Sequence, residues 1–389
     1  MKAVIAFLFL LLTGCNSETD SSTNTDQSAK NYTVDEALNL ALTKYSHTAT
    51  NLSLNDGYPR VVENGRWRAI ANEDWTDGFY PGILWMLSEL DPEMESRAEK
   101  WTIPLTSRTS FGGHDIGFII NNSFGKAYNT TGKHEYLEVI KTGAINLSAR
   151  YSSAVGAIRS WDFGRYKYPV IIDNLMNLEL LFNASTLIVV PEWHEQAVSH
   201  AFKTLDNHVR SDFSSFHLVD YNPSNGEAIF RGTVQGAAND STWARGQAWG
   251  IYGFAMIYEM TGLSEFEVTS YQMAKYFMQN LPSDNVPFWD LNLNNQNEPR
   301  DSSAAAIAAA GMLRLSHNTQ SKEQQDQLTE WAQLLTYSLL TSEYLNSDPK
   351  YPALLVAATG NKPANREINT SLIYADYYFI EALLIQTPK

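Results

Sequence analysis

Six long apolar segments, spread along almost the whole chain, constrain the fold more than any other feature of this sequence. Each has a polar or turn-like start and continues with apolar and small residues that carry few charges. The segments begin at Trp75, His114, Ile171, Trp243, Arg300 and Ile368. A helix that is apolar on nearly all sides belongs in a protein interior. The pattern therefore predicts interior helices.

Six amphipathic helices are expected before or between these segments. The clearest covers 191–210, where apolar residues from Trp193 to Val209 recur on one helical face. Pro191 suits a first helical turn, whereas the Thr-Gly pairs at 131–132 and 261–262 suit helix ends. The other five amphipathic helices are expected over 34–50, 93–103, 133–150, 264–280 and 321–343.

The alternation of outer and inner helices predicts an all-α fold. Six helical hairpins can stack side by side and close into a ring, the (α/α)6 toroid or six-hairpin barrel. No parallel-sheet pattern is present, and one strand pair is expected within 212–235 around the turn-like SNGE at 224–227. Residues 32–389 contain no second polar linker, so we expect one large domain there.

The start of the chain has a different composition. Lys2, an apolar run over 3–12 and Leu-Thr-Gly-Cys ending at Cys15 resemble a bacterial lipoprotein signal. The run is too short for a bilayer span, which needs about 20 apolar residues. The resemblance implies a signal peptide over 1–14, a lipid on Cys15, a polar tether over 15–31 and a place in the cell envelope of a Gram-negative-type bacterium. A signal with a chance cysteine is the alternative.

Composition excludes several other functions. The net charge of −15 and the pI of about 5.0 argue against nucleic acid or an anionic membrane surface as a general partner. Cys15 is the only cysteine, so a disulfide within the chain is impossible. The histidines form no metal-binding pattern, and no Gly-x-Ser-x-Gly or phosphate-binding loop occurs. We therefore expect no metal and no other cofactor, and the oligomeric state stays open.

The loops that enter the inner helices carry most of the candidate functional residues. Inner helices that run roughly parallel would bring these loops together at one end of the ring. Aromatic rings beside hydrogen-bonding groups suit a carbohydrate. The candidates are Asp74, Trp75, His114, Asp115, Trp161, Asp173, His217, Gln235, Trp243, Arg245 and the loop 361–369.

Asp173 lies in the apolar stretch PVIIDNLMNLELLF and has two possible roles. It could cap the helix that follows, where backbone N–H groups would lower its pKa. Alternatively, its apolar neighbours could raise its pKa and make it a proton donor near neutral pH. Asp115 in GGHDIGF has the same ambiguity, and Arg245 could form a salt bridge or grip a carboxylate. Trp161 in SWDFGRY is a candidate plate for stacking a sugar.

Taken together, these residues resemble the unsaturated glucuronyl hydrolases, glycoside hydrolase family 88. The matching pieces are WTDGFYPGILW, GGHDIGF, YPVIIDNLMNLELL, HLVDY, TVQG with DSTWARGQAWGIYG, and SLIYADYYFIEALL, in order along the chain. The resemblance implies an (α/α)6-barrel catalytic domain. It also implies an exo-acting enzyme that removes a 4,5-unsaturated uronic acid from lyase-generated oligosaccharides by hydrating the C4=C5 enol ether.

The same resemblance implies roles for individual residues. Asp173 would be the general acid/base, and Asp115 would position the sugar and tune Asp173. His217 and Gln235 match positions near the water and the uronate. The remaining matches, as sugar or carboxylate contacts, are His114, Trp161, Trp243 and Arg245.

Two alternatives remain open at this point. One is an unsaturated rhamnogalacturonyl hydrolase of the related family 105, and the other is a non-catalytic glycan-binding lipoprotein. The expected partner is a small oligosaccharide in each case. The polymer that supplies it is not predicted, although residues 359–370 are expected to influence tolerance of sulfate.

Overall fold

A computed structural model describes residues 30–387 of the chain. Cys15, the predicted signal peptide and most of the predicted tether lie outside these residues. Within the described part, no helix combines the length and the apolar character needed to cross a bilayer.

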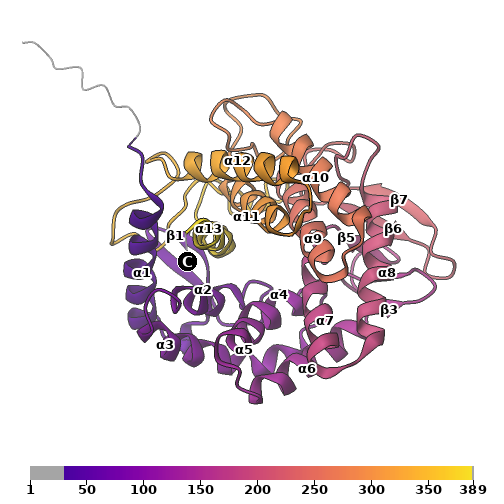
Figure 1. Ribbon diagram of the computed structural model, residues 1–389, viewed down its shortest axis with the longest axis horizontal. Helices are drawn as coiled ribbons and strands as arrows, with labels where there is room; N and C mark the ends of the chain where they lie inside the picture. The colour runs from indigo at the N-terminus through magenta and orange to yellow at the C-terminus, as the bar shows by residue number, and fades with distance from the viewer. Residues whose placement is uncertain (1–29, 388–389) are drawn as a thin grey trace, which may run out of the picture.

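The described helices form two concentric layers around one axis (Figure 1). Each inner helix packs against the next, and the last packs against the first, so that the ring closes. The inner layer consists of α2 (Phe79–Leu87), α4 (Ile116–Ile120) continued by the π-helical η3 (Asn121–Gly125) and α5 (Lys126–Thr131), α7 (Asn174–Ile188), α9 (Ala244–Thr261), α11 (Ser302–Asn318) and α13 (Ile373–Gln386). The predicted (α/α)6 fold is confirmed.

The outer layer covers the inner one, and its helices lie close to the expected positions. They are α1 (Val34–Asn51), α3 (Glu93–Thr102), α6 (Glu135–Ser148), α8 (Pro191–His208), α10 (Ser264–Gln279) and α12 (Lys322–Leu339). Thr33 and Glu36 form a reciprocal capping box at the start of α1. Gly132 and Gly262 end α5 and α9 with φ of 66° and 68°, as the Thr-Gly pairs predict.

Small residues allow the inner helices to approach one another closely. The run AAAIAAAG makes α11 almost entirely buried. A Cβ atom added to Gly311 would lie 2.7 Å from the backbone of Tyr252 on α9. The absence of a side chain at Gly311 is therefore required for this helix contact.

Three small antiparallel sheets accompany the ring. The strand pair expected within 212–235 is confirmed as β6 (Leu218–Tyr221) and β7 (Ala228–Gly232), and β5 (Pro169–Ile171) extends it to three strands. Two further strand pairs were not predicted from the sequence: β1 (Tyr58–Glu63) with β2 (Arg66–Ile70), and β3 (Tyr151–Ser152) with β4 (Ala157–Ile158). Two short 3-10 helices, η1 (Leu54–Asp56) and η2 (Ile103–Ser110), complete the described elements.

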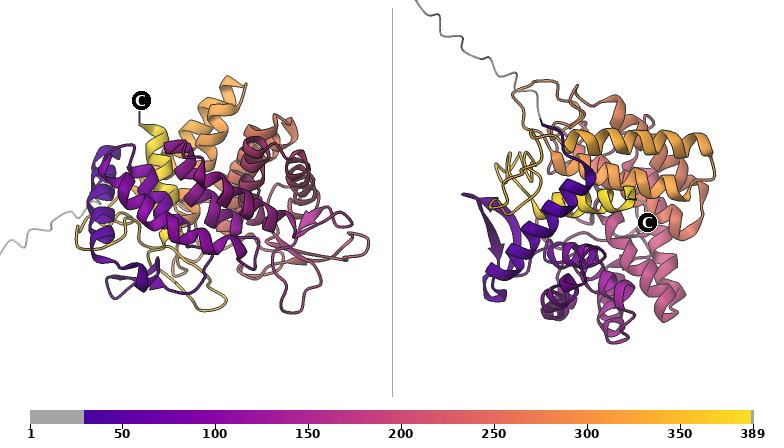
Figure 2. Two further views of the ribbon diagram at one scale, coloured as in Figure 1. Left: turned by 90° about the horizontal axis from the view of Figure 1, so that it is seen from below. Right: turned by 60° about the vertical axis from the view of Figure 1, so that its left-hand side comes forward.

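The strands and long loops gather at one end of the ring, on the lower side of the left view in Figure 2. Strand β5 leads directly into α7, so the sheet holds the segment that precedes Asp173. This end receives the starts of the inner helices, as the sequence analysis predicts.

Candidate active site

A pocket of about 260 Å³ opens where the inner helices begin. Asp115, Asp173 and Trp243 occupy the N-cap positions of α4, α7 and α9, and all three line the pocket. Of the other candidates from the sequence, Trp75, His114, Trp161, Gln235 and Arg245 line it as well, together with Asn361 and Glu367 of the loop 361–369. The ring thus brings together residues that are distant in sequence.

Asp173 occupies the cap position of α7 without capping it. Its side chain makes no hydrogen bond to the helix start, and its Oδ2 is buried without a hydrogen-bond partner. The side chain is only 14% exposed. Burial and, second, the charge of Asp115 raise the pKa of Asp173 to about 7, although the Arg245 cation opposes the shift. Of the two roles that the sequence left open, this geometry favours the proton donor.

His217 lies beside Asp173 and is held by the loop that follows β7. Its Nδ1 accepts the backbone N–H groups of Val234 and Gln235, both at 3.3 Å. Nε2 therefore carries the proton of the neutral ring, and it lies 3.6 Å from Asp173 Oδ2. Burial and then the charge of Arg245 lower the pKa of His217 well below its usual value. His217 thus presents an N–H donor, and no charge, to the carboxyl group.

The ring of His217 also packs on the indole of Trp243, with centroids 4.5 Å apart and planes at 37°. Trp243 is buried, so its indole supports the imidazole from the side of α9. Trp243 and the loop that follows β7 therefore hold the His217 ring in place beside Asp173.

Asp115 faces the pocket from the start of α4. Its carboxylate makes no cap hydrogen bond, and its side chain is 22% exposed. Asn177 Nδ2 donates to Asp115 Oδ1 at 3.3 Å, and His114 Nε2 lies 3.4 Å from the same oxygen. Asn177 lies in the matched segment IIDNLMN but was not singled out from the sequence. Its local sequence gives no signal of this contact, because only the packing of α4 against α7 brings its partners to it.

Arg245 is buried, and its guanidinium group already donates hydrogen bonds to acceptors within the protein. Its Nη1 forms an ion pair with Asp301 Oδ2 at 2.7 Å and donates to Thr359 O at 2.6 Å. Its Nη2 donates to Gly360 O at 2.5 Å. The salt bridge considered from the sequence is therefore present, and it ties the loop at 359–360 to the pocket wall. The cation still faces the pocket as a lining residue.

Trp161 and Gln235 lie at the wall of the pocket. Trp161 is partly buried and stacks on Phe163, with centroids 6.0 Å apart. Gln235 Nε2 donates to Gly360 O at 3.1 Å. Trp161 is thus in contact with the Phe163 ring, and Gln235 with the backbone of Gly360.

Several lining residues were not predicted as site residues, namely Arg60, Phe118, Ile171, Gly360 and Tyr374, whereas Glu367 belongs to the candidate loop 361–369. Arg60 comes from the unpredicted strand β1 and forms ion pairs with Asp74 and Glu367, each at 2.6 Å. The pair with Glu367 joins the N-terminal hairpin to the loop before α13. Such a contact between distant segments leaves no mark in either local sequence.

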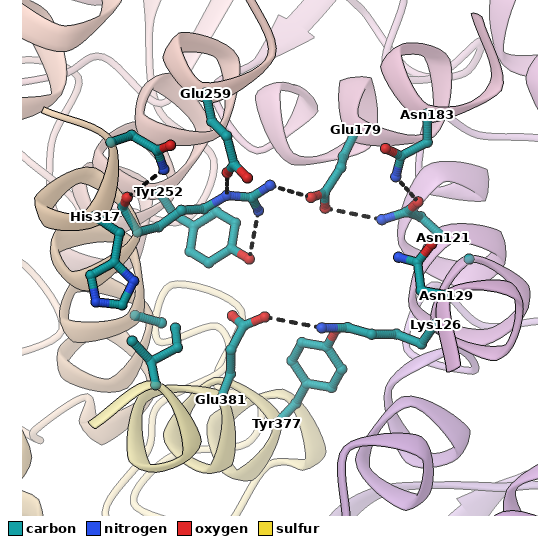
Figure 3. Close-up of a pocket in the computed structure, with 15 residues that line it drawn as sticks. Asn121, Lys126, Asn129, Glu179, Asn183, Tyr252, Glu259, His317, Tyr377 and Glu381 are labelled. Atoms are coloured by element: carbon teal, nitrogen blue, oxygen red, sulfur yellow. Dashed lines mark hydrogen bonds and ion pairs between the residues drawn. The ribbon is translucent and has the colours of Figure 1, made fainter. Parts of the chain in front are cut away.

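A second cavity, of about 420 Å³, is lined by later turns of the inner helices (Figure 3). There, Arg314 on α11 pairs with Glu179 on α7 at 2.6 Å and with Glu259 on α9. Lys126 on α5 pairs with Glu381 on α13 at 3.2 Å. Both cations are matched by carboxylates, and the ion pairs join α11 to α7 and α9, and α5 to α13. The candidate acid and its partners lie in the other cavity.

Within residues 30–387, no group of three or more histidine, cysteine or acidic side chains is arranged to hold a metal ion.

No family model matches the chain. Among curated proteins, an unsaturated glucuronyl hydrolase of Formosa agariphila is 37% identical over 381 residues, which cover 95% of this chain and 93% of that protein. An unsaturated glucuronyl hydrolase of Bacillus sp. (strain GL1) is 33% identical over 87% of this chain and 93% of that protein. An unsaturated chondroitin disaccharide hydrolase of Streptococcus agalactiae is 31% identical over 82% of this chain and 83% of that protein.

Solved structures show the same likeness. A crystal structure of an unsaturated glucuronyl hydrolase specific for heparin has a TM-score of 0.86 at 38% identity, covering 90% of this chain and 96% of that one. The unsaturated glucuronyl hydrolase of Streptococcus agalactiae has a TM-score of 0.85 at 30% identity, covering 91% and 92%. A variant of the latter enzyme has been solved with dGlcA-GalNAc6S bound, at a TM-score of 0.79 and 28% identity over 92% of both chains.

Proposed function

This chain belongs to the unsaturated glucuronyl hydrolases, exo-acting glycoside hydrolases that remove a 4,5-unsaturated uronic acid from the non-reducing end of oligosaccharides, and we propose that Asp173 is its general acid/base. The observation that carries the proposal is the Asp173 carboxyl group. It is buried at the pocket and free of cap hydrogen bonds, and its pKa is raised to about 7. A carboxyl group that is still protonated near neutral pH can act as a proton donor there.

The reaction proceeds at the carbon–carbon double bond of the uronate. Asp173 gives its proton to C4, and positive charge develops at C5 and the ring oxygen. A water molecule adds its oxygen to C5 and returns a proton to Asp173. The resulting hemiketal opens to a ketone at C5, which leaves a hemiacetal at C1 that releases the remaining sugar as an alcohol.

The neighbours of Asp173 support the charges that develop. As the carboxyl group ionises, the Nε2–H of His217 can donate to it after a small closure of the present 3.6 Å separation. The negative charge of Asp115 favours the positive charge that forms on the sugar. Arg245, Gln235 and the inner-helix N-termini at the pocket suit the uronate carboxylate. Trp161 offers an aromatic surface to the following sugar.

A matched pair of substrates tests this function. The expected result is loss of enol-ether ultraviolet absorbance when the protein acts on an unsaturated disaccharide made by a polysaccharide lyase. Its saturated counterpart should remain intact, because it has no C4=C5 bond to protonate. Cleavage of both at similar rates would indicate attack at the anomeric carbon and contradict the proposal.

We propose disaccharides derived from glycosaminoglycans as the substrate class. Support comes from the chain's similarity to a chondroitin disaccharide hydrolase and to a heparin-specific unsaturated glucuronyl hydrolase. Chondroitin- and heparin-derived disaccharides, each with and without sulfate, should be turned over at measurable and different rates. Turnover of unsaturated rhamnogalacturonan disaccharides alone would reject this assignment.

We also propose that the mature protein is anchored in the cell envelope through a lipid on Cys15. Support comes from the Leu-Thr-Gly-Cys motif after the apolar run of 3–12. Radiolabelled palmitate should enter the wild-type protein expressed in a Gram-negative host, and Cys15→Ser should abolish the label and release the protein from the membrane fraction. Equal labelling of both proteins would refute the anchor.

A further inference from the structure

We infer that Asn177 is a positioning residue that holds the Asp115 carboxylate in register with Asp173. This inference rests on the proposed function and adds a residue to which no role has been given. Asn177 contacts Asp115 and the backbone of α4 at the same time. It lies on α7 four residues after Asp173, and residues four apart lie on one face of a helix.

The orientation of the Asn177 amide follows from its hydrogen bonds. Its Oδ1 accepts the backbone N–H of Phe118 at 2.7 Å. Only the oxygen end of an amide side chain can accept an N–H, so the amide nitrogen must be the end that faces the pocket. That nitrogen, Nδ2, lies 3.3 Å from Asp115 Oδ1 and 3.5 Å from His114 Nδ1. Asn177 therefore presents a donor, and no negative charge, to the carboxylate.

Close helix packing keeps this amide in place. A Cβ atom added to Gly117 would lie 2.5 Å from the Cα of Asn177, so α4 and α7 are in backbone contact at this point. Asn177 is fully buried, and both ends of its amide have partners. A buried side chain with so many fixed contacts has little freedom to rotate. The acid and the group that holds its neighbouring carboxylate thus belong to one rigid helix.

The role of Asn177 predicts opposite effects for two substitutions. In Asn177→Ala, Asp115 loses its donor and its fixed position, so its charge acts less on Asp173. The alkaline limb of kcat/KM should move to lower pH. In Asn177→Asp, the bond to Phe118 N can remain, but a second negative charge enters beside the carboxylates. The alkaline limb should then move to higher pH.

The experiment measures kcat/KM on an unsaturated disaccharide from pH 5 to 9 for both variants. We expect kcat/KM to fall about tenfold or more in each, with limb shifts of about half a pH unit in opposite directions. Asn183→Ala is the matched control. Asn183 also lies on α7 and bonds Asn121 of η3 at 2.9 Å, at the end of the helix remote from the acid. It should leave the limb in place.

Each outcome separates this inference from the proposed function. If the wild-type protein shows no turnover, the proposed function fails. If it turns over substrate but both Asn177 variants lose activity with an unmoved alkaline limb, Asn177 is only a packing residue and the inference is wrong. Should Asn177→Ala fail to fold by circular dichroism, the near-isosteric Asn177→Asp decides alone. A limb that stays in place or moves to lower pH in that variant overturns the inference.

Discussion

Replacing Asp173 with asparagine should stabilise the folded protein at alkaline pH. The folded-state pKa of Asp173 is about 7, whereas its ordinary value is 3.8. Between pH 3.8 and about pH 7, the Asp173 carboxyl group is protonated in the folded protein but ionised in the unfolded chain. The free energy of unfolding must therefore fall as pH rises through this window. Above about pH 7 the Asp173 carboxyl group is ionised in both states.

The size of this effect follows from the pKa shift. Each pH unit inside the window changes the free energy of unfolding by 1.36 kcal/mol, so the interval from pH 5 to pH 7 removes about 3 kcal/mol. Asparagine has a similar shape and no charge to bury. Relative to the wild type, Asp173→Asn should thus gain about 3 kcal/mol between pH 5 and pH 8. For a chain of this length, that corresponds to roughly 4 °C in Tm.

Thermal unfolding followed by circular dichroism at pH 5 and pH 8 measures this difference. Asp326→Asn is the control, because Asp326 is 65% exposed on α12 and forms only a surface ion pair with Lys322. Its Tm offset from the wild type should be the same at both pH values. An equally constant offset for Asp173→Asn would refute the claim that the folded protein keeps this carboxyl group protonated.

Three further predictions concern the site and the ring. Asp115→Asn removes a charge that raises the pKa of Asp173, which is about 7 in the wild type. The alkaline limb of any residual kcat/KM should therefore lie at a lower pH than in the wild type. An unchanged limb would show that burial alone raises this pKa. His217→Phe keeps a ring on Trp243 but loses the N–H donor, so kcat should fall about 100-fold with a KM within a few-fold of the wild type; an equal rise in KM would instead indicate substrate binding. Gly311→Ala forces a methyl group against the backbone of Tyr252 and should lower stability by about 2 kcal/mol in urea unfolding; an unchanged midpoint would contradict the close helix contact.

The ring could be predicted from the sequence because helix periodicity and turn residues are local signals. Interior and exterior helices differ in how many faces are apolar, and the Thr-Gly pairs at 131–132 and 261–262 mark where helices end. The sequence also contained an unused hairpin signal. Asn64-Gly65 connects β1 and β2 with φ of 52° and 74°, the type I′ turn that this dipeptide favours. Because this hairpin was not predicted, Arg60 on β1 was not predicted as a site residue either.

The site could be predicted only in part, because one position can serve two roles. An aspartate before a helix suits both a cap and an acid, and only the side-chain orientation of Asp173 distinguishes them. The partner of Arg245 lies at Asp301, and the partner of Arg60 lies at Glu367. Such pairs depend on closure of the ring. Asn177 was overlooked because a single amide in an apolar helix has no pattern of its own until the neighbouring helix is in place.

The turnover of Asp173→Asn on an unsaturated disaccharide tests the central claim most directly. The amide cannot give a proton to C4, so kcat should fall by about 1000-fold or more, because proton transfer itself is lost. Calorimetry should still detect binding of the disaccharide within a few-fold of the wild-type affinity. A variant that retains kcat within tenfold of the wild type would show that another group protonates the sugar and would contradict this account.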